Sequence, residues 1–182
     1  MSHANPTPES QKVLFPGGNC ILSPDRCRQT LRRMACQILE RNDEERRILL
    51  AGVRHGGEGV ARQLAHELKL LNHELVVEVT HIILDKSNPT ENPVNLGVDL
   101  APWTNGVVVV VDDVAHTGRT LLHALRPFLD TSFLRLQVAV LVDRAHKTHP
   151  IHPDYVGVSL ATTLQEHIEV VQSADSFSVW LL

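Results

Sequence analysis

The sequence is poor in cysteine: its 182 residues include only Cys20, Cys27 and Cys36, and these form no Cys-x-x-Cys pair. An odd number of separated thiols argues against a disulfide framework and favours reduced thiols in a cytoplasmic protein. The polar opening MSHANPTPES has no charged region followed by an apolar run, so no export signal is expected. No apolar stretch is long enough to cross a bilayer, and no membrane partner is expected.

The sequence also lacks a basic excess, because its formal net charge is -4 and its pI is about 6.2. This balance gives no general support for nucleic-acid binding, so any RNA site must be local. Neither Gly-x-x-x-x-Gly-Lys-Ser/Thr nor Gly-x-Gly-x-x-Gly occurs, which argues against a P-loop nucleotidase and a dinucleotide-binding fold. With 43% hydrophobic residues, the chain can bury a core without disulfides or a structural metal.

Strand-like and helix-like segments alternate along the chain. Strands are predicted at residues 48–53, 76–84, 107–111, 136–142, 155–160, 168–171 and 177–182. Helices are predicted from the capping Ser23 to about Arg41, over residues 60–71, and after Thr120 as far as Leu129. This alternation predicts an α/β fold with a mainly parallel central sheet flanked by helices on both faces.

The two polar stretches of the chain suggest its domain organisation. Residues 1–20 are expected to be a mobile tail, and residues 21–182 a single domain. Residues 85–106 are polar and contain three prolines, and a loop of this length in a compact domain is typical of a lid or a disordered segment.

The run VVVVVDDVAHTGRT, residues 107–120, is the most informative segment. Five valines predict a strand buried on both faces, and the turn between this strand and the next helix is a typical place for a ligand. Thr117, Gly118 and Thr120 suit a monophosphate, because hydroxyls and free backbone N–H groups bind anions. Asp112 and Asp113 would repel a phosphate, so they are expected to face ribose hydroxyls.

This combination resembles the 5-phosphoribosyl 1-diphosphate (PRPP) signature of type I phosphoribosyltransferases. That signature has a hydrophobic strand, an acidic pair, a few variable residues and then Thr-Gly-x-Thr. The alternative is an ordinary buried strand followed by a capped helix. That alternative explains the valines and one threonine, but not two consecutive acids beside Thr-Gly-Arg-Thr.

A second motif, LVDRAHKTHPIHPDYVG at residues 141–157, narrows the resemblance to one family. It is similar to the segment that follows the signature in the bifunctional pyrimidine operon attenuator and uracil phosphoribosyltransferase family. The similarity runs from about residue 21 to the end and is poor over residues 74–106. It implies the type I phosphoribosyltransferase fold, with a small hood segment beside the sheet.

The resemblance assigns a role to each part of the site. Asp112 and Asp113 would bind the ribose hydroxyls and assist catalysis, and the turn after them would bind substrate, with residues 115–120 at the 5-phosphate: Val114, Ala115, His116, Thr117, Gly118, Arg119 and Thr120. The base pocket would be lined by Asp143, Arg144, Tyr155 and Val156. For Arg144 the alternative is a surface salt bridge, and for Tyr155 it is a core aromatic.

Pyrophosphate would bind at the turn formed by Arg54, His55, Gly56 and Gly57, where this sequence departs from the family. The family usually has Thr-Arg-Gly at this turn, and this sequence has His55-Gly56-Gly57 at the matching positions. Arg54 is therefore the candidate catalytic cation. The expected lid has Lys86 as its only basic residue, so efficient catalysis is less well supported than binding.

The reaction implied is the conversion of uracil and PRPP to uridine monophosphate (UMP) and pyrophosphate. Mg²⁺ is the implied cofactor, carried mainly by the diphosphate and not by a protein metal site. A homodimer or higher homo-oligomer is implied as well. The alternatives are a transferase for another base, or a catalytically weak regulator that senses PRPP or nucleotides and binds RNA.

Two further clusters have simpler explanations. Seven arginines near the first helix, offset by nearby acids, suggest a solvated helix face, with RNA binding there weak and salt-dependent: Arg26, Arg28, Arg32, Arg33, Arg41, Arg46 and Arg47. The three loop histidines His146, His149 and His152 invite a transition-metal site. Pro150 and Pro153 prevent a helix that would align them, so solvated side chains are expected.

Overall fold

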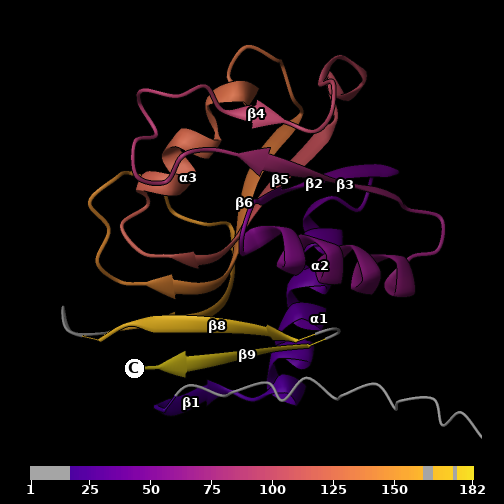
Figure 1. Cartoon of the computed structure of the whole chain (residues 1–182). Helices are drawn as coiled ribbons and strands as arrows, with labels where there is room; N and C mark the ends of the chain where they lie inside the picture. The colour runs from indigo at the N-terminus through magenta and orange to yellow at the C-terminus, as the bar shows by residue number, and fades with distance from the viewer. Residues whose placement is uncertain (1–16, 162–165, 174–175) are drawn as a thin grey trace, which may run out of the picture.

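The computed structural model describes residues 17–161, 166–173 and 176–182. Its main sheet has the strand order β4-β3-β2-β5-β6-β7 (Figure 1). The strands are β2 (Arg47–Val53), β3 (Val76–Ile83), β4 (Asn95–Leu96), β5 (Val107–Ala115), β6 (Arg135–Arg144) and β7 (Tyr155–Leu160). All neighbouring pairs are parallel except β3 with β4, which confirms the mainly parallel sheet that the sequence predicts.

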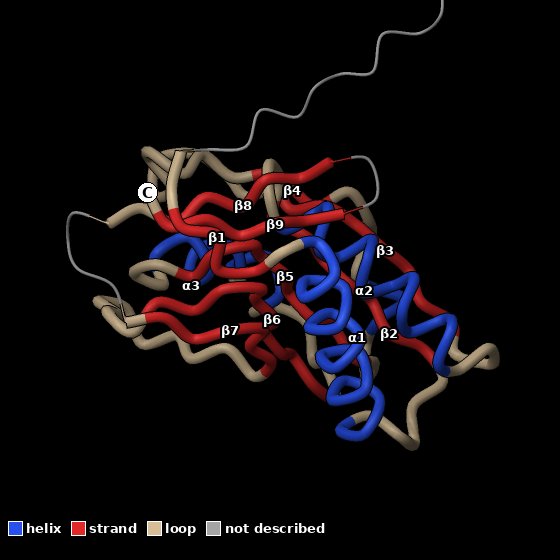
Figure 2. Tube along the Cα trace, turned by 90° about the horizontal axis from the view of Figure 1, so that it is seen from below, coloured by secondary structure: helices blue, strands red, loops and turns tan. Residues whose placement is uncertain are grey.

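Strand β5 lies in the middle of the sheet, and its five consecutive valines, residues 107–111, are fully buried on both faces. Val107, Val109 and Val111 pack into the core beneath α1 (Pro24–Arg41) and α2 (Gly57–Leu71). Val108 and Val110 face the opposite core, beneath the short α3 (Arg119–Ala124). Figure 2 shows α1 and α2 side by side on one face of the sheet. Because strand side chains alternate, consecutive residues of β5 point into different layers.

Helix α1 begins where the sequence predicts. The Ser23 hydroxyl accepts a hydrogen bond from the backbone N–H of Arg26, and Pro24 occupies the first helical position. The helix ends at Arg41, and Leu31, Met34 and Ile38 are buried on its inner face. No helix in the described residues is long and apolar enough to span a membrane.

A second sheet of three antiparallel strands forms the hood, with the order β1-β9-β8. It combines β1 (Asn19–Leu22) from the start of the chain with β8 (Ile168–Ser173) and β9 (Ser176–Leu181) from its end. Asn19 and Cys20, assigned to a tail by the sequence, therefore belong to a strand. Residues 1–16 of that predicted tail lie outside the described residues.

The segment 85–106, expected to be a lid or a disordered loop, packs onto the protein. It contains β4 and a short 3₁₀ helix, Ala101–Trp103, and four of its apolar side chains lie against the core below α3: Val94, Leu96, Val98 and Leu100. Trp103 is only 2% exposed, and the guanidinium of Arg47 lies 4.4 Å from the centre of its ring. Composition suggested a mobile loop, but spaced apolar residues anchor the segment at several points.

The helix that follows β5 is shorter than predicted. Its α-helical part ends at Ala124, and a 3₁₀ turn, Arg126–Phe128, follows. Pro127 has no backbone N–H to continue an α-helical hydrogen-bond ladder, which explains the early end.

The burial of Trp103 makes the segment 85–106 part of the core. We predict that Trp103→Ala lowers the free energy of unfolding by about 3–5 kcal/mol, the usual cost of emptying a buried aromatic site. Leu129→Ala, at a side chain that is 71% exposed, should change it by less than about 0.5 kcal/mol. Urea denaturation measures both, and a Trp103 variant as stable as the parent would show that this segment is not anchored.

Candidate active site

The acidic pair lies at the carboxyl end of β5, where open α/β sheets bind ligands. Asp112 is 2% exposed and lines a cavity of about 210 Å³ on the α3 side of the sheet. Asp113 is partly buried and lines a second cavity of about 450 Å³ on the hood side. The pair therefore occupies the boundary between two adjoining cavities.

The buried carboxyl group of Asp112 lies beside the charge of Asp113. Burial, and then the charge of Asp113, raises the pKa of Asp112 well above its ordinary value, while the nearby Lys86 opposes this effect. The Asp112 carboxylate accepts a hydrogen bond from the backbone N–H of Asp113 at 3.0 Å. That of Asp113 accepts one from the N–H of Val114 at 2.8 Å. Backbone donors thus fix both side chains, and charge repulsion remains for a ligand or cation to relieve.

The glycine-rich turn between β2 and α2 packs directly against this pair. A Cβ atom on Gly57 would overlap the carbonyl oxygen of Val111 and lie 2.6 Å from the Cα atom of Asp112. A Cβ on Gly56 would lie 2.5 Å from the carboxylate carbon of Asp113. His55 has a φ of 70°, in the left-handed region that non-glycine residues rarely adopt. The predicted pyrophosphate turn is thus held at the acidic pair.

The 210 Å³ cavity is formed mainly by the turn that joins β5 to α3. Gly118 has a φ of 82°, which glycine adopts without strain, and the Thr117 hydroxyl accepts a hydrogen bond from the N–H of Arg119 at 3.3 Å. Residues of the predicted phosphate site line this cavity together with Asp112 and Lys86: Val114, Ala115, His116, Thr117, Gly118, Arg119 and Thr120. Its size and donors suit a sugar phosphate.

The 450 Å³ cavity lies between the sheet and the hood. Its walls are Asp113 and Val114 of β5, Arg144 at the end of β6, and a run from the hood, His167, Ile168, Glu169 and Val170. Lys86 and His116 line this cavity as well as the first. A flat ring bound here would meet apolar hood side chains and the polar ends of two strands.

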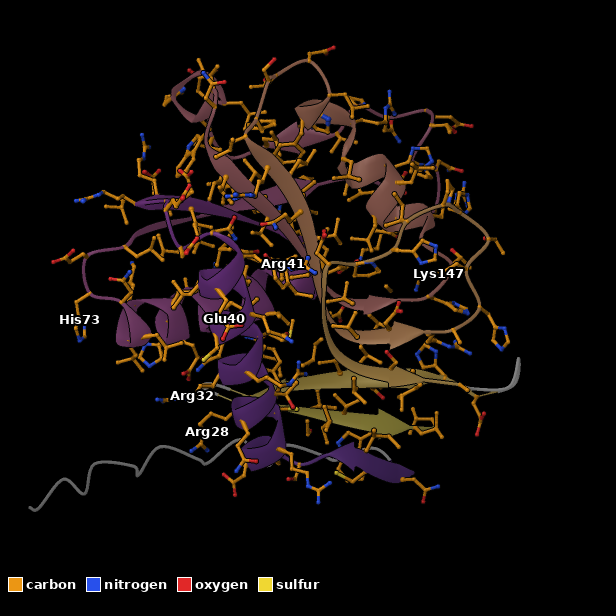
Figure 3. The ribbon with its side chains drawn as sticks, turned by 180° about the vertical axis from the view of Figure 1, so that it is seen from behind. Arg28, Arg32, Glu40, Arg41, His73 and Lys147 are labelled. Carbon is orange, nitrogen blue, oxygen red and sulfur yellow. The ribbon has the colours of Figure 1, made fainter. Side chains whose placement is uncertain are left out.

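Lys147 is a structural residue that the sequence analysis missed. Its ammonium group pairs with the Asp143 carboxylate and donates to the carbonyl oxygens of Ala115, at 2.9 Å, and Arg144, at 3.0 Å. It lies in the loop beyond β6 (Figure 3). The backbone N–H groups of Thr148 and His149 both donate to the carbonyl oxygen of Thr117, at 3.1 Å each. This loop therefore supports the turn between β5 and α3, the predicted phosphate site.

Most of the chain is similar to known phosphoribosyl transferases. A model of the phosphoribosyl transferase domain matches residues 21–175, most of the chain. The chain belongs to the phosphoribosyltransferase family. It is 38% identical to a bifunctional protein PyrR from Synechocystis sp., over 82% of this chain and 87% of that protein. It is 35% identical to a bifunctional protein PyrR from Pelotomaculum thermopropionicum, over 82% and 86%.

Solved structures agree on the fold of this phosphoribosyltransferase. A hypoxanthine-guanine phosphoribosyltransferase from Bacillus anthracis matches with a TM-score of 0.67 and 23% identity, over 82% of this chain and 86% of that chain. A hypoxanthine phosphoribosyltransferase from Trypanosoma cruzi, solved with the product IMP, matches with a TM-score of 0.69 and 16% identity, over 92% and 96%. The predicted family, fold and enzyme class are confirmed.

The structure brings together only part of the predicted base pocket. Arg144 is 4% exposed and lines the hood-side cavity, whereas the carboxylate of Asp143 is engaged by Lys147. Val156 is partly buried, and its carbonyl oxygen accepts a hydrogen bond from Arg33 of α1 at 3.1 Å. The apolar cover of the cavity comes instead from Ile168 and Val170 of the hood, which the sequence analysis had not considered.

The side chain of Tyr155 lies in the core and lines neither cavity, while a role for the backbone of Tyr155 and Val156 in the base pocket stays a prediction. Tyr155 is 1% exposed and belongs to the core beneath α1, where its hydroxyl accepts a hydrogen bond from the side-chain amide of Asn42 at 3.3 Å. It stands at the first residue of β7, and its strand partner is Ala139, well before the end of β6. The alternative of a core aromatic is therefore the correct one.

The basic side chains around the site also differ in position from the sequence prediction. Arg54 is exposed in the glycine-rich turn and lines neither cavity, whereas Lys86 lines both. Lys86 is held in a turn whose Asp85 carboxylate accepts hydrogen bonds from the N–H groups of Ser87, at 2.9 Å, and Asn88, at 3.2 Å. The described residues contain no group of three or more metal-ligating side chains, at the loop histidines or elsewhere.

The buried acidic pair should reduce the stability of the unliganded protein. We predict that Asp112→Asn raises the free energy of unfolding at pH 7, because burial and the charge of Asp113 penalise the ionised carboxylate of the parent. The pKa of Asp112 is higher in the folded state than in the unfolded state, where it is about 3.9. Protonation of Asp112 therefore stabilises the folded parent below about pH 3.9, and this stabilisation is lost as the pH rises. The advantage of the variant should therefore grow from pH 4 to pH 8.

Urea denaturation across this pH range measures the effect. Asp130→Asn, at an exposed position, is the control and should show no such trend. An Asp112→Asn protein less stable than the parent at every pH would show that the fold requires the charged carboxylate.

Proposed function

We propose that this phosphoribosyltransferase converts uracil and PRPP to UMP and pyrophosphate. The observation that carries this proposal is the pair of adjoining cavities at the end of β5, with the acidic pair between them. One cavity has the donors for a sugar phosphate, and the other has the size and apolar cover for a base. The similarity to two bifunctional PyrR proteins favours a pyrimidine as that base.

The residues act mainly by positioning the two substrates. Thr117, Gly118 and Thr120 hold the 5-phosphate, and the two carboxylates accept hydrogen bonds from the ribose hydroxyls. This arrangement fixes the anomeric carbon at the boundary of the two cavities, with the base held against the hood. The transition state resembles a ribosyl oxocarbenium ion, so nearby carboxylates also stabilise its positive charge.

Mg²⁺ fits this site as a cofactor bound through the substrate. The cation takes few protein ligands, keeps several waters and prefers phosphate and carboxylate oxygens. The buried carboxylate of Asp112, next to the charge of Asp113, would supply an oxygen ligand to the ion. When bound, Mg²⁺ neutralises part of the charge on the departing diphosphate.

Two cations of the chain are placed to receive the pyrophosphate. Arg54 lies in the turn whose next glycine, Gly56, touches the side chain of Asp113. Lys86 stands at both cavities, and its charge acts on Asp112. Because the family arginine is missing from the aligned position, we propose that these two side chains replace it together.

RNA binding is proposed only as a weak activity. Several arginines of α1, the helix labelled through Arg28, Arg32 and Arg41 in Figure 3, already face acidic partners. The ion pairs are Arg28 with Asp25, Arg32 with Glu67, and Arg41 with Asp154. Few charges are left to neutralise phosphates, so affinity should be low and strongly dependent on salt.

A homodimer is the proposed assembly. Leu70 of α2 and Val76 and Val79 of β3 are exposed apolar side chains beside the edge strands of the main sheet. Strand β4 pairs with β3 only at Ile82 and Ile83, so the first part of β3 is left unpaired by β4. A second copy covering this region would remove apolar surface and an open edge from water.

A panel of bases tests the proposed reaction. With Mg²⁺, PRPP and one base at a time, we expect pyrophosphate release with uracil and formation of UMP, measured by a coupled pyrophosphate assay and by chromatography. Release with a purine and not with uracil would transfer the assignment to another base. No release with any base would favour the nucleotide-sensing regulator.

The two cations should be separable by substitution. We predict that Arg54→Ala and Lys86→Ala each lower kcat/KM for PRPP by about 100-fold, the usual effect of removing one donor to a developing anion. His152→Ala, in the exposed part of the 146–152 loop, and Arg26→Ala, on the outer face of α1, are the controls and should stay within about twofold. If the kcat/KM of Arg54→Ala matches that of the controls, then of these two side chains only Lys86 binds the pyrophosphate.

A further inference from the structure

Three residues line both cavities and so mark the point where they meet: Lys86, Val114 and His116. In the proposed reaction, the anomeric carbon of PRPP is on the phosphate side of this point and the base is on the hood side. The nitrogen of the base that attacks this carbon must therefore lie at the junction. Any side chain that exchanges a proton with that nitrogen must lie there too.

Uracil carries a proton on N1, and this proton must leave as the glycosidic bond forms. The carboxylates of Asp112 and Asp113, at the same boundary, are engaged by the ribose hydroxyls in the proposed reaction. Val114 cannot accept the proton, and a lysine ammonium group has no lone pair for it. A neutral imidazole has one ring nitrogen free to accept a proton. We propose that His116 is the general base that takes the N1 proton of the incoming pyrimidine, an inference that rests on the function proposed above.

The step is balanced without any other reactant. The electron pair on N1 forms the bond to the anomeric carbon, and the bond from that carbon to the diphosphate oxygen breaks with its pair going to oxygen. The N1 proton passes to the unprotonated ring nitrogen of His116. The imidazolium then returns the proton to water, since the ring lies at an exposed position.

The surroundings keep this imidazole neutral. Partial burial lowers the pKa of His116, and the charges of Arg144 and Lys147 and of the neighbouring His167 and His146 lower it further. Lys86, in the loop after β3, lines the same two cavities as His116 and is also positively charged. The acidic groups at these cavities are Asp112 and Asp113 on β5 and Glu169 on β8. The ring is thus available as a base at neutral pH, and its lowered pKa extends that range toward acid.

The role differs from the one that the sequence resemblance gave to His116, which was contact with the 5-phosphate. A neutral imidazole contributes no charge to phosphate binding. The residues after it, Thr117 to Thr120, already provide two hydroxyls and the glycine turn. The side chain that lines both cavities is therefore better suited to the base than to the phosphate.

His116→Gln tests this proposal, since the exposed position should accept the change without loss of the fold. We expect kcat with uracil to fall by about 100-fold or more, the usual contribution of a general base. The KM for PRPP should stay within about twofold, because phosphate contacts are kept. The parent should lose activity as the pH falls through the pKa of His116, and this acidic limb should disappear in the variant.

Two further measurements sharpen the test. His123→Gln is the matched control, because burial and neighbouring arginines also lower the pKa of His123, but it lines neither cavity. It should keep the rate and the acidic limb. Added imidazole should partly restore the rate of His116→Ala, as expected when only a proton acceptor is missing.

The outcomes separate this proposal from the proposed function. If the parent makes UMP and His116→Gln keeps its rate and acidic limb, the general-base role is overturned and the transferase function stands. A raised KM for PRPP with unchanged kcat would return His116 to the phosphate site. If the parent releases no pyrophosphate with any base, both proposals fall.

Discussion

The contact between the glycine-rich turn and the end of β5 is the constraint on which the site depends. Gly57 stands so close to Val111 and Asp112 that any side chain there would overlap the backbone of β5. This approach brings the start of α2 and the exposed Arg54 to the same edge of the sheet as the acidic pair. The two βα turns of the site, between β2 and α2 and between β5 and α3, can converge only because this position has no Cβ atom.

The acidic pair illustrates a compromise between stability and function. Burial and then the charge of Asp113 raise the pKa of Asp112, so ionising this carboxyl group is unfavourable until a ribose hydroxyl or a cation stabilises it. The surrounding structure tolerates this because β5 is fixed on both faces by packed valines. Lys147 and the loop after β6 hold the phosphate turn from the other side.

The hood gives the site its second chamber and joins the two ends of the chain. Strand β1 pairs with β9 and not with β8, while β8 supplies the side chains that face Asp113 and Arg144. The apolar cover of the hood-side cavity, the proposed base pocket, therefore comes from a sheet separate from the one that carries the acids. Because the hood sheet lies above the end of β5, His116 lines both cavities.

The sequence by itself determined the parallel sheet, the cap of α1 at Ser23 and the position of the acidic pair. These features depend on local periodicity and on motifs of adjacent residues, which are visible along the chain. The role of Tyr155, the packing of residues 85–106 and the part played by Lys86 were decided only by the tertiary structure. Each depends on which face of a strand or loop a side chain occupies and on what lies opposite. Contacts between residues far apart in the chain leave no periodic signal. The sequence therefore allows the Tyr155 side chain either in the base pocket or in the core, and its hydrogen bond with Asn42 places it in the core.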